Sequence, residues 1–265
     1  MKGSFFMKKF IALLMSVLML SAVFAGCGEK KEDGKKDNKS SKVWVIATDT
    51  AFNPFEYTDA SGNFVGIDVD VLAAIAKDQK FEYKLNSLGW DASIAACQAG
   101  QADAMIAGAS ITEKRKNEGW IFSDGYYTAT QCMTVAKDSD IKSFDDIKGK
   151  TVAVKTGTMG ATYAESLKDK YGFKITYLED SPTVYQTVIG GQAAALFEDT
   201  PVMKASIKSG DLALKVIESS ENEGAPYGLA IFNKDNQEFL DLFNAGLKNI
   251  KASGEYDKII EKYLG

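Results

Sequence analysis

Short apolar runs and helix-like repeats of apolar residues alternate along the chain from Lys42 onward. Val43 to Ala47 is a continuous apolar run that ends in polar residues, which predicts a buried strand. Residues 67–77 (IDVDVLAAIAK) place apolar side chains at the spacing of a helix. Because buried strands and helices take turns in this way, the pattern predicts an α/β fold with parallel sheets covered by helices.

The same two patterns predict the other main elements. Further buried strands are expected at 103–107, 151–154 and 193–197, and helices at 91–98, 161–171 and 256–263. One face of a long helix near the C-terminus is marked by Phe239, Leu242, Phe243, Leu247 and Ile250.

The first 27 residues have the features of an export signal. Lys8 and Lys9 precede an apolar stretch, residues 10–24, and small residues follow it up to Cys27. The apolar stretch is too short for a membrane-spanning helix. Met7 is an alternative start of the protein, with residues 1–6 as an over-extended reading frame.

Cys27 is the candidate for lipid attachment. Residues 24–27 (FAGC) resemble a bacterial lipobox, in which the cysteine receives diacylglycerol and becomes the mature N-terminus, although Phe24 stands where leucine is usual. The alternative is an ordinary cleavable signal with an incidental cysteine. Residues 28–41 contain no apolar side chain and are expected to form a flexible linker.

Composition removes several classes of function. The chain has no histidine, which excludes histidine-dependent enzymes and imidazole metal sites, and no cysteine spacing suggests a metal or another cofactor. A formal charge of −5 and a pI of about 5.0 argue against nucleic-acid binding. Export would permit a disulfide, but Cys97 and Cys132 each lie among apolar residues and are expected to be buried free thiols.

Polar side chains gather where four predicted strands end. Ligands of open α/β sheets bind beyond the carboxyl ends of the strands. The polar residues at these positions are Asp49, Gly108, Ser110, Thr112, Lys155, Thr156, Gly157, Thr158, Glu198 and Asp199. Charges of both signs at such an edge predict a site for a small zwitterion.

Arg115 and Asp199 are candidates for the two charges of an α-amino acid. Arg115 is the only arginine of the chain, and a guanidinium binds a carboxylate with two hydrogen bonds where lysine acts as a point charge. The alternative, a surface arginine in a charged stretch, is equally compatible with composition. Asp199 could bind the ammonium, or cap the helix that Thr200-Pro201 begins.

Two aromatic residues are candidates for the walls of the site. Phe52, in a loop sequence, and Trp90 could enclose the aliphatic part of a ligand, whereas Trp44 is expected in the core. The turn at 155–160 offers free N–H groups to an anion but lacks the spacing of a phosphate-binding loop.

Seven segments together resemble family 3 of the extracellular solute-binding proteins, especially its members that bind glutamine and other polar amino acids. They occur in the family's order and span nearly all of residues 42–265. The segments are ATDTAFNPFEY (47–57), GIDVDVLAAIAK (66–77), DAMIAGASITEKRK (103–116), FSDGYY (122–127), VAVKTGTMGATYAE (152–165), FEDTPV (197–202) and APYGLAI (225–231).

The resemblance implies a clamshell of the type II periplasmic-binding fold, in which two α/β lobes joined by two strands close on the ligand. Carried over, lobe 1 spans 42–125 plus 228–265 and lobe 2 spans 130–224. The crossings between them fall at 126–129 and 225–227.

The resemblance also implies roles for the candidate residues. Arg115 would bind the carboxylate and Asp199 the ammonium, with Phe52 and Trp90 as walls. Contacts to the α-substituents would come from Gly108, Ser110 and Thr158, and contacts to the ligand side chain from Asp49, Lys155 and Glu198. Two departures lie near the side-chain end: Glu198 stands where related Gram-negative glutamine binders often have histidine, and Met159 replaces a small residue.

The expected function is ligand capture for an ABC importer, by a monomeric lipoprotein on the outer face of a cell membrane or in the periplasm, with the permease subunits as partners. Lys155 disfavours a cationic ligand side chain, and Asp49 and Glu198 disfavour an acidic one, so glutamine is favoured. If Lys155 pairs with Glu198 instead, the surplus anion favours arginine or lysine.

Two other functions compete with this one. The same fold has a dehydratase-like branch, whose chemistry needs a carboxylic acid of raised pKa, and Glu198 could serve. A sensory module is the third hypothesis, against which the sequence shows no membrane segment or kinase up to Gly265.

Overall fold

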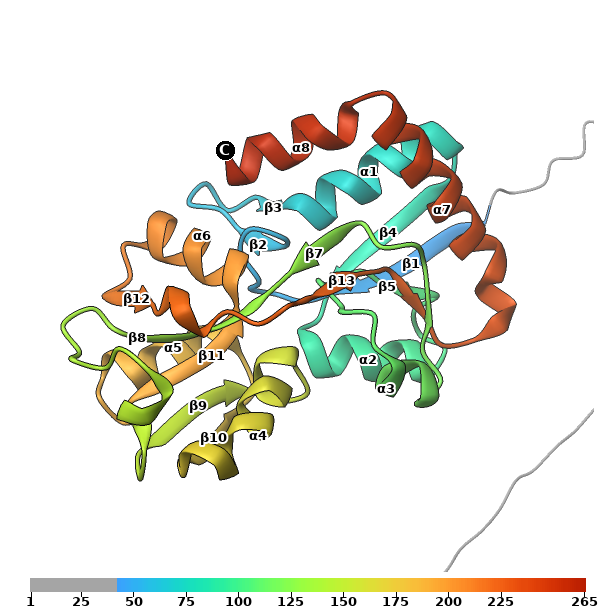
Figure 1. The fold of residues 1–265 in the computed structure, drawn as a ribbon. Helices are drawn as coiled ribbons and strands as arrows, with labels where there is room; N and C mark the ends of the chain where they lie inside the picture. The colour runs from blue at the N-terminus through green and yellow to red at the C-terminus, as the bar shows by residue number, and fades with distance from the viewer. Residues whose placement is uncertain (1–41) are drawn as a thin grey trace, which may run out of the picture. The chain divides into compact units, whose positions relative to one another are not determined.

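The computed structural model describes residues 42–265 (Figure 1). The predicted signal segment, Cys27 and the linker at 28–41 lie outside the described residues. Within residues 42–265, no helix has both the length and the apolar character that crossing a membrane requires. The described part contains two five-stranded sheets with their own helices, which confirms the predicted two-lobed α/β fold.

The first sheet has the strand order β4-β1-β5-β14-β6. Its strands are β1 (Val43–Thr48), β4 (Glu82–Ser87), β5 (Ala104–Met105), β6 (Ile121–Phe122) and β14 (Ala230–Ile231). β1 runs parallel to β4 and β5, whereas β14 is antiparallel to both of its neighbours. A strand from the end of the chain therefore lies between two strands from its first half.

Alternate side chains of β1 fill two different cores. Successive side chains of a strand point to opposite faces of the sheet. Trp44 and Ile46 therefore enter one apolar cluster, whereas Val45 and Ala47 enter the other. The ring of Trp44 lies 4.9 Å from that of Phe239, so the prediction that Trp44 belongs to the core is confirmed.

The second sheet has the order β10-β9-β11-β8-β12. Its strands are β8 (Gln131–Ala136), β9 (Thr151–Lys155), β10 (Lys174–Leu178), β11 (Ala195–Asp199) and β12 (Leu214–Val216). β9 is parallel to β10 and β11, and β8 is antiparallel to β11 and β12. Val152 and Val154 enter one core and Ala153 the other, because this sheet too is covered on both faces.

Two further pairs of strands complete the sheet structure. β7 (Tyr127–Ala129) and β13 (Ala225–Tyr227) pair antiparallel with each other. Along the chain, each of them stands between a strand of one sheet and a strand of the other. β2 (Tyr57–Thr58) pairs antiparallel with β3 (Phe64–Val65). The residues at which one lobe gives way to the other remain a prediction, with β7 and β13 at the positions proposed for the crossings.

Eight α-helices and three short 3-10 helices lie between the strands of the described part or follow the last of them. The α-helices are α1 (Ile67–Gln79), α2 (Trp90–Gln98), α3 (Glu113–Asn117), α4 (Met159–Tyr171), α5 (Ser181–Ile189), α6 (Thr200–Gly210), α7 (Gln237–Ala252) and α8 (Glu255–Leu264). The 3-10 helices are η1 (Phe144–Ile147), η2 (Glu218–Ser220) and η3 (Lys234–Asn236). Helices α1, α7 and α8 pack together beside the first sheet (Figure 1).

Several predicted boundaries were wrong by one or more residues, and those of three elements lie near the site. The strand predicted at 193–197 is β11, which extends to Asp199, so Glu198 and Asp199 are its last residues. The predicted helix at 161–171 begins at Met159, because the Thr158 side chain caps it by accepting a hydrogen bond from the N–H of Ala161. The strand predicted at 103–107 is cut to Ala104–Met105, since the chain turns at Gly108, where φ is +54°.

Gly66 provides a test of how α1 is placed. Its φ is +142°, and an added Cβ would lie 2.0 Å from the carbonyl oxygen of Phe55, whereas Gly62, with φ of +84°, has open space around it. We expect Gly66→Ala to lower the free energy of unfolding by about 3 kcal/mol or more, since backbone strain and overlap add. Gly62→Ala should cost only about 1 kcal/mol. Equal losses in urea denaturation of the two variants would contradict this placement.

Candidate functional site

All ten residues predicted for the binding site line one cavity. Its walls are formed by Asp49, Phe52, Trp90, Ala107, Gly108, Ser110, Arg115, Lys155, Thr158, Met159, Glu198 and Asp199. Residues from both sheets contribute, because the strand ends of the two lobes face the same space. The structure thus brings the predicted residues together; their roles toward a ligand remain predictions.

An ion pair between the two lobes lies in this cavity. Lys155 is the last residue of β9 in the second sheet, and its Nζ contacts the carboxylate of Asp49, which follows β1 in the first. Each residue is only 3% exposed. The remaining space for the centre of a water molecule is about 10 Å³, which is room for about one water.

Arg115 lies on the short helix α3, which Thr112 caps. Its Nη1 donates to the carbonyl of Ser110 at 2.9 Å, and its Nη2 donates across the cleft to the carbonyl of Gly157 at 3.2 Å. The residue is 7% exposed and forms no salt bridge with any residue in 42–265. Burial lowers the pKa of the guanidinium to about 10, so it remains a cation at neutral pH. The alternative of an exposed surface arginine is excluded.

Asp199 is the N-cap residue of α6 by its backbone, but its side chain does not cap the helix. The carboxylate instead accepts hydrogen bonds from Nε2 of Gln131 and from the hydroxyl of Tyr227. Burial raises the pKa of Asp199, while these two hydrogen bonds and the charge of Arg115 act in the opposite direction. The carboxylate is therefore turned into the cavity and away from the helix end.

Glu198 is held separately from the ion pair. Its carboxylate accepts hydrogen bonds from Oγ of Ser181 at 2.9 Å and from the N–H of Asp199 at 3.0 Å. Burial, together with the neighbouring charge of Asp199, raises the pKa of Glu198 to about 7. Lys155 pairs with Asp49, so the arrangement in which Lys155 neutralises Glu198 is not the one observed.

Phe52, one wall of the cavity, packs against Gly108. Phe52 and Trp90 are each 6% exposed, and a Cβ at Gly108 would lie 2.4 Å from Cε1 of Phe52, so only glycine fits there. The N–H of Gly108 donates to Oδ2 of Asp68 at 2.9 Å. Burial raises the pKa of Asp68 to about 6. Since its N–H is engaged, Gly108 has only its carbonyl left for a ligand.

The hydroxyl of Thr158 is likewise engaged within the protein. It donates to the carbonyl of Lys155 at 2.8 Å and accepts from the N–H of Ala161 at 3.3 Å. Its structural function is therefore to fix the turn from β9 into α4. The N–H groups of that turn, rather than the hydroxyl, are better placed to contact an anion.

Four residues that support the charges were not predicted from the sequence. Tyr227 and Gln131 hold Asp199, Ser181 holds Glu198, and Trp120 lies beside Arg115. Tyr227 lies within a segment that carries the family resemblance, which is the only signal that could have pointed to it. Gln131 and Ser181 approach their partners through the folding of distant segments, whereas Trp120 reaches Arg115 through the turn after α3, and the local sequence gives no sign of either.

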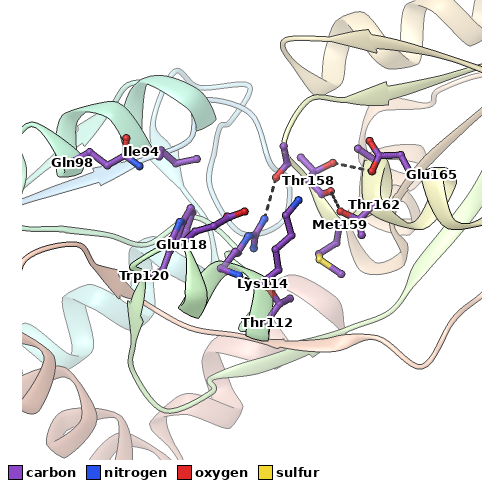
Figure 2. A pocket seen from close by; sticks show the side chains of 13 residues that line it. Ile94, Gln98, Thr112, Lys114, Glu118, Trp120, Thr158, Met159, Thr162 and Glu165 are labelled. Atoms are coloured by element: carbon purple, nitrogen blue, oxygen red, sulfur yellow. Dashed lines mark hydrogen bonds between the residues drawn. The ribbon is translucent and has the colours of Figure 1, made fainter.

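A second, larger cleft adjoins the site cavity (Figure 2). It offers about 560 Å³ and shares Arg115, Thr158 and Met159 with the site. In Figure 2, Trp120 and Glu118 lie on one side of it, and Met159 and Thr162 lie on the other. Arg115 therefore stands at the boundary between two spaces.

The cysteines are as predicted. Cys97 and Cys132 are buried and unpaired, and burial raises the pKa of both thiols to about 12, so they are unreactive at neutral pH. Within residues 42–265 there is also no group of three or more acidic or cysteine side chains that could hold a metal ion.

Comparison with known proteins places the chain among binding proteins. Residues 44–265 match the family described as bacterial extracellular solute-binding proteins, family 3. The chain is 34% identical to the arginine-binding extracellular protein ArtP of Bacillus subtilis over 260 residues, which covers 97% of this chain and 98% of that protein.

Two solved structures extend the comparison. An ancestral arginine-binding protein, solved both with arginine and with glutamine, is 34% identical with a TM-score of 0.77; the match covers 84% of this chain and 98% of that one. Substrate-binding domain 2 of GlnP from Lactococcus lactis, in an open conformation, is 38% identical with a TM-score of 0.59, covering 85% of this chain and 96% of the domain.

The raised pKa of Glu198 predicts how stability depends on pH. Between pH about 4.5 and about 7 the folded protein keeps a proton on Glu198 that the unfolded chain has lost, so the free energy of unfolding falls as the pH rises. Glu198→Gln removes this contribution. From pH 5 to 7.5 the wild type should lose about 2 kcal/mol more than the variant. Equal losses of stability in the wild type and in Glu198→Gln over this pH range, measured by denaturation, would show that the carboxyl of Glu198 has an ordinary pKa.

Proposed function

Because the chain belongs to family 3 of the bacterial extracellular solute-binding proteins, we propose that it captures a polar amino acid, with glutamine favoured, between its two lobes. In this proposal it delivers the ligand to the permease of an ABC importer. The observation that carries the proposal is the arrangement of the buried ionisable groups in the cavity: beside Glu198, whose pKa is about 7, there are one matched ion pair and two opposite charges that are not paired with each other.

The two unpaired charges suit the two ends of an α-amino acid. Arg115 uses two N–H groups on main-chain carbonyls and has further donors for a carboxylate. The carboxylate of Asp199 accepts from neutral donors only, so it can take a charged ammonium as well. A zwitterion would neutralise both groups at once, which a monovalent ion would not.

The matched ion pair suits a neutral polar side chain. Lys155 and Asp49 together carry no net charge, and they present one donor and one acceptor. The amide of glutamine has a carbonyl for Lys155 and an NH₂ group for Asp49, so it could take the place of the direct contact between them. A cationic or an acidic side chain would leave one member of the pair opposed by a like charge.

Binding would require the lobes to part and close again. The cavity holds about one water molecule, and contacts such as Asn53 Nδ2 to Ser209 Oγ at 2.7 Å join the two lobes. The chain also has a higher TM-score with the ligand-bound ancestral protein than with the open GlnP domain, despite lower identity to it. A ligand that touches both lobes stabilises the closed state by the contacts made only there.

A basic amino acid is the second candidate. ArtP is named as an arginine-binding protein, and the ancestral protein was solved with arginine as well as with glutamine. If Glu198 is ionised when a ligand is bound, it would add the negative charge that arginine or lysine requires. A dehydratase-like reaction is the third, because Glu198 has the raised pKa of a general acid.

The proposed setting is the outer side of a cell membrane. We propose export by the signal at residues 1–27, a lipid on Cys27, a flexible linker at 28–41 and a monomeric binding unit. The relatives in the comparison include proteins described as extracellular or periplasmic, which supports export.

A thermal-shift screen tests the proposed function. The purified protein, refolded to remove any bound ligand, is melted with each of the twenty amino acids. Glutamine at a hundredfold excess over its Kd should stabilise by about 2.7 kcal/mol. Asp199→Ala should abolish the shift. A shift with arginine or lysine alone would overturn the preference for glutamine, and no shift with any amino acid would overturn the proposal. Chemical conversion of a bound ligand would favour the dehydratase-like function over binding alone.

Replacing Lys155 tests the assignment of the ion pair to the ligand side chain. Lys155→Leu leaves Asp49 without its partner, so glutamine affinity should fall at least tenfold and arginine affinity should rise by about as much. Isothermal titration calorimetry measures both. Lys168→Leu, at an exposed position on α4, is the matched control and should change neither. Equal losses for both ligands would show that Lys155 only maintains the fold.

A further inference from the structure

The guanidinium of Arg115 lies in a corner formed by two indole rings. Its Cζ is 5.0 Å from the ring centre of Trp90 and 5.1 Å from that of Trp120. The two ring centres are only 6.2 Å apart, so they meet at an angle around the cation and do not cover its opposite faces. One side of the guanidinium is thereby left open.

The two tryptophans differ in where they lie. Trp90 lines the site cavity and is among the predicted ligand walls, whereas Trp120 lines the adjoining cleft but not the site cavity (Figure 2). Trp120 is 7% exposed, and its ring centre lies 5.6 Å from that of Phe122 and 4.6 Å from that of Phe232. Its ring is therefore fixed beside Arg115 from outside the site.

An aromatic face suits this cation because it uses none of the N–H donors. A carboxylate beside Arg115 would stabilise the buried charge but would occupy the groups needed for a ligand. The face of an indole ring attracts a cation most strongly when water is excluded, and leaves those N–H groups free. Within residues 42–265 the hydrogen bonds of the guanidinium go only to two main-chain carbonyls, and the charges of Asp199 and Glu118 act on it without a salt bridge, so the rings are the groups packed directly on its face.

We propose that Trp120 is a positioning residue that sets recognition of the ligand's α-carboxylate by holding Arg115 as a dry, oriented cation with free donors. The inference rests on the proposed function, since it assigns the carboxylate to Arg115. It predicts that Trp120 contributes to the affinity for ligands that carry this carboxylate and little to the affinity for ligands that lack it.

The test compares L-glutamine with its α-carboxamide in the wild type, Trp120→Leu and Trp120→Phe. Trp120→Leu should weaken L-glutamine about five- to thirtyfold, and the α-carboxamide less than twofold, so that discrimination between the two falls. Trp120→Phe should restore part of it. Phe232→Leu is the matched control: it removes a ring that packs against Trp120 but leaves the indole of Trp120 beside Arg115, so it should preserve discrimination between the two ligands. Equal weakening of both ligands by Trp120→Leu would overturn the proposal.

A second measurement needs no ligand. Arg115 is the only arginine, so its Nε–Hε group gives a single identifiable signal in a ¹⁵N–¹H spectrum. Ring currents from the indoles should displace that signal from its random-coil position, and Trp120→Leu should move it substantially while Phe232→Leu should not. An unmoved signal would overturn the role of Trp120 whatever the protein binds. A moved signal in a protein that binds no amino acid would show that the proposed function alone had failed.

Discussion

Charged side chains that are buried between two lobes need opposite charges or hydrogen-bond partners within the protein, because water no longer solvates them. The pairing of Lys155 with Asp49 is the central case, since each side chain is almost fully buried and each comes from a different sheet. An attraction of this kind can offset the loss of hydration only with good geometry and further hydrogen bonds. The cleft therefore favours a partner that can satisfy both groups when the direct contact is broken.

The other charges of the cleft are stabilised in ways that leave them available. Asp199 rests on the neutral donors of Gln131 and Tyr227, and Arg115 rests on carbonyls and indole rings. Neither group is neutralised by an opposite charge in direct contact. A fold selected for stability alone would gain by pairing them, so their separation is understandable as a feature of a binding site.

The sequence predicted which residues come together in one cavity better than it predicted the limits of the elements around them. Charged and glycine residues at strand ends mark a site because strands of a parallel sheet end at one edge, and this rule depends little on exact boundaries. That is why Asp49, Lys155 and Asp199 were identified although the limits of β11 and α4 were misplaced by about two residues.

What the sequence could not predict are the particular contacts that the side chains make. The sequence left open whether Lys155 pairs with Glu198 or contacts only the ligand. In the structure Lys155 pairs with Asp49. Trp120 was not singled out from the sequence, although it lies only five positions after Arg115. Its proximity to Arg115 follows from the turn at the end of α3, where the N–H of Trp120 donates to the carbonyl of Arg115 at 3.1 Å.

The position of β14 has a consequence for how the chain assembles. β14 is formed by Ala230–Ile231 and lies between β5 and β6, so the first sheet cannot join its two edges until the chain has been made past residue 231. The strands of the second sheet, from 131 to 216, are by then all present. The lobe whose synthesis begins first is thus the one that is completed last. During synthesis β6 lacks its neighbour β14 while more than a hundred residues are added to the chain.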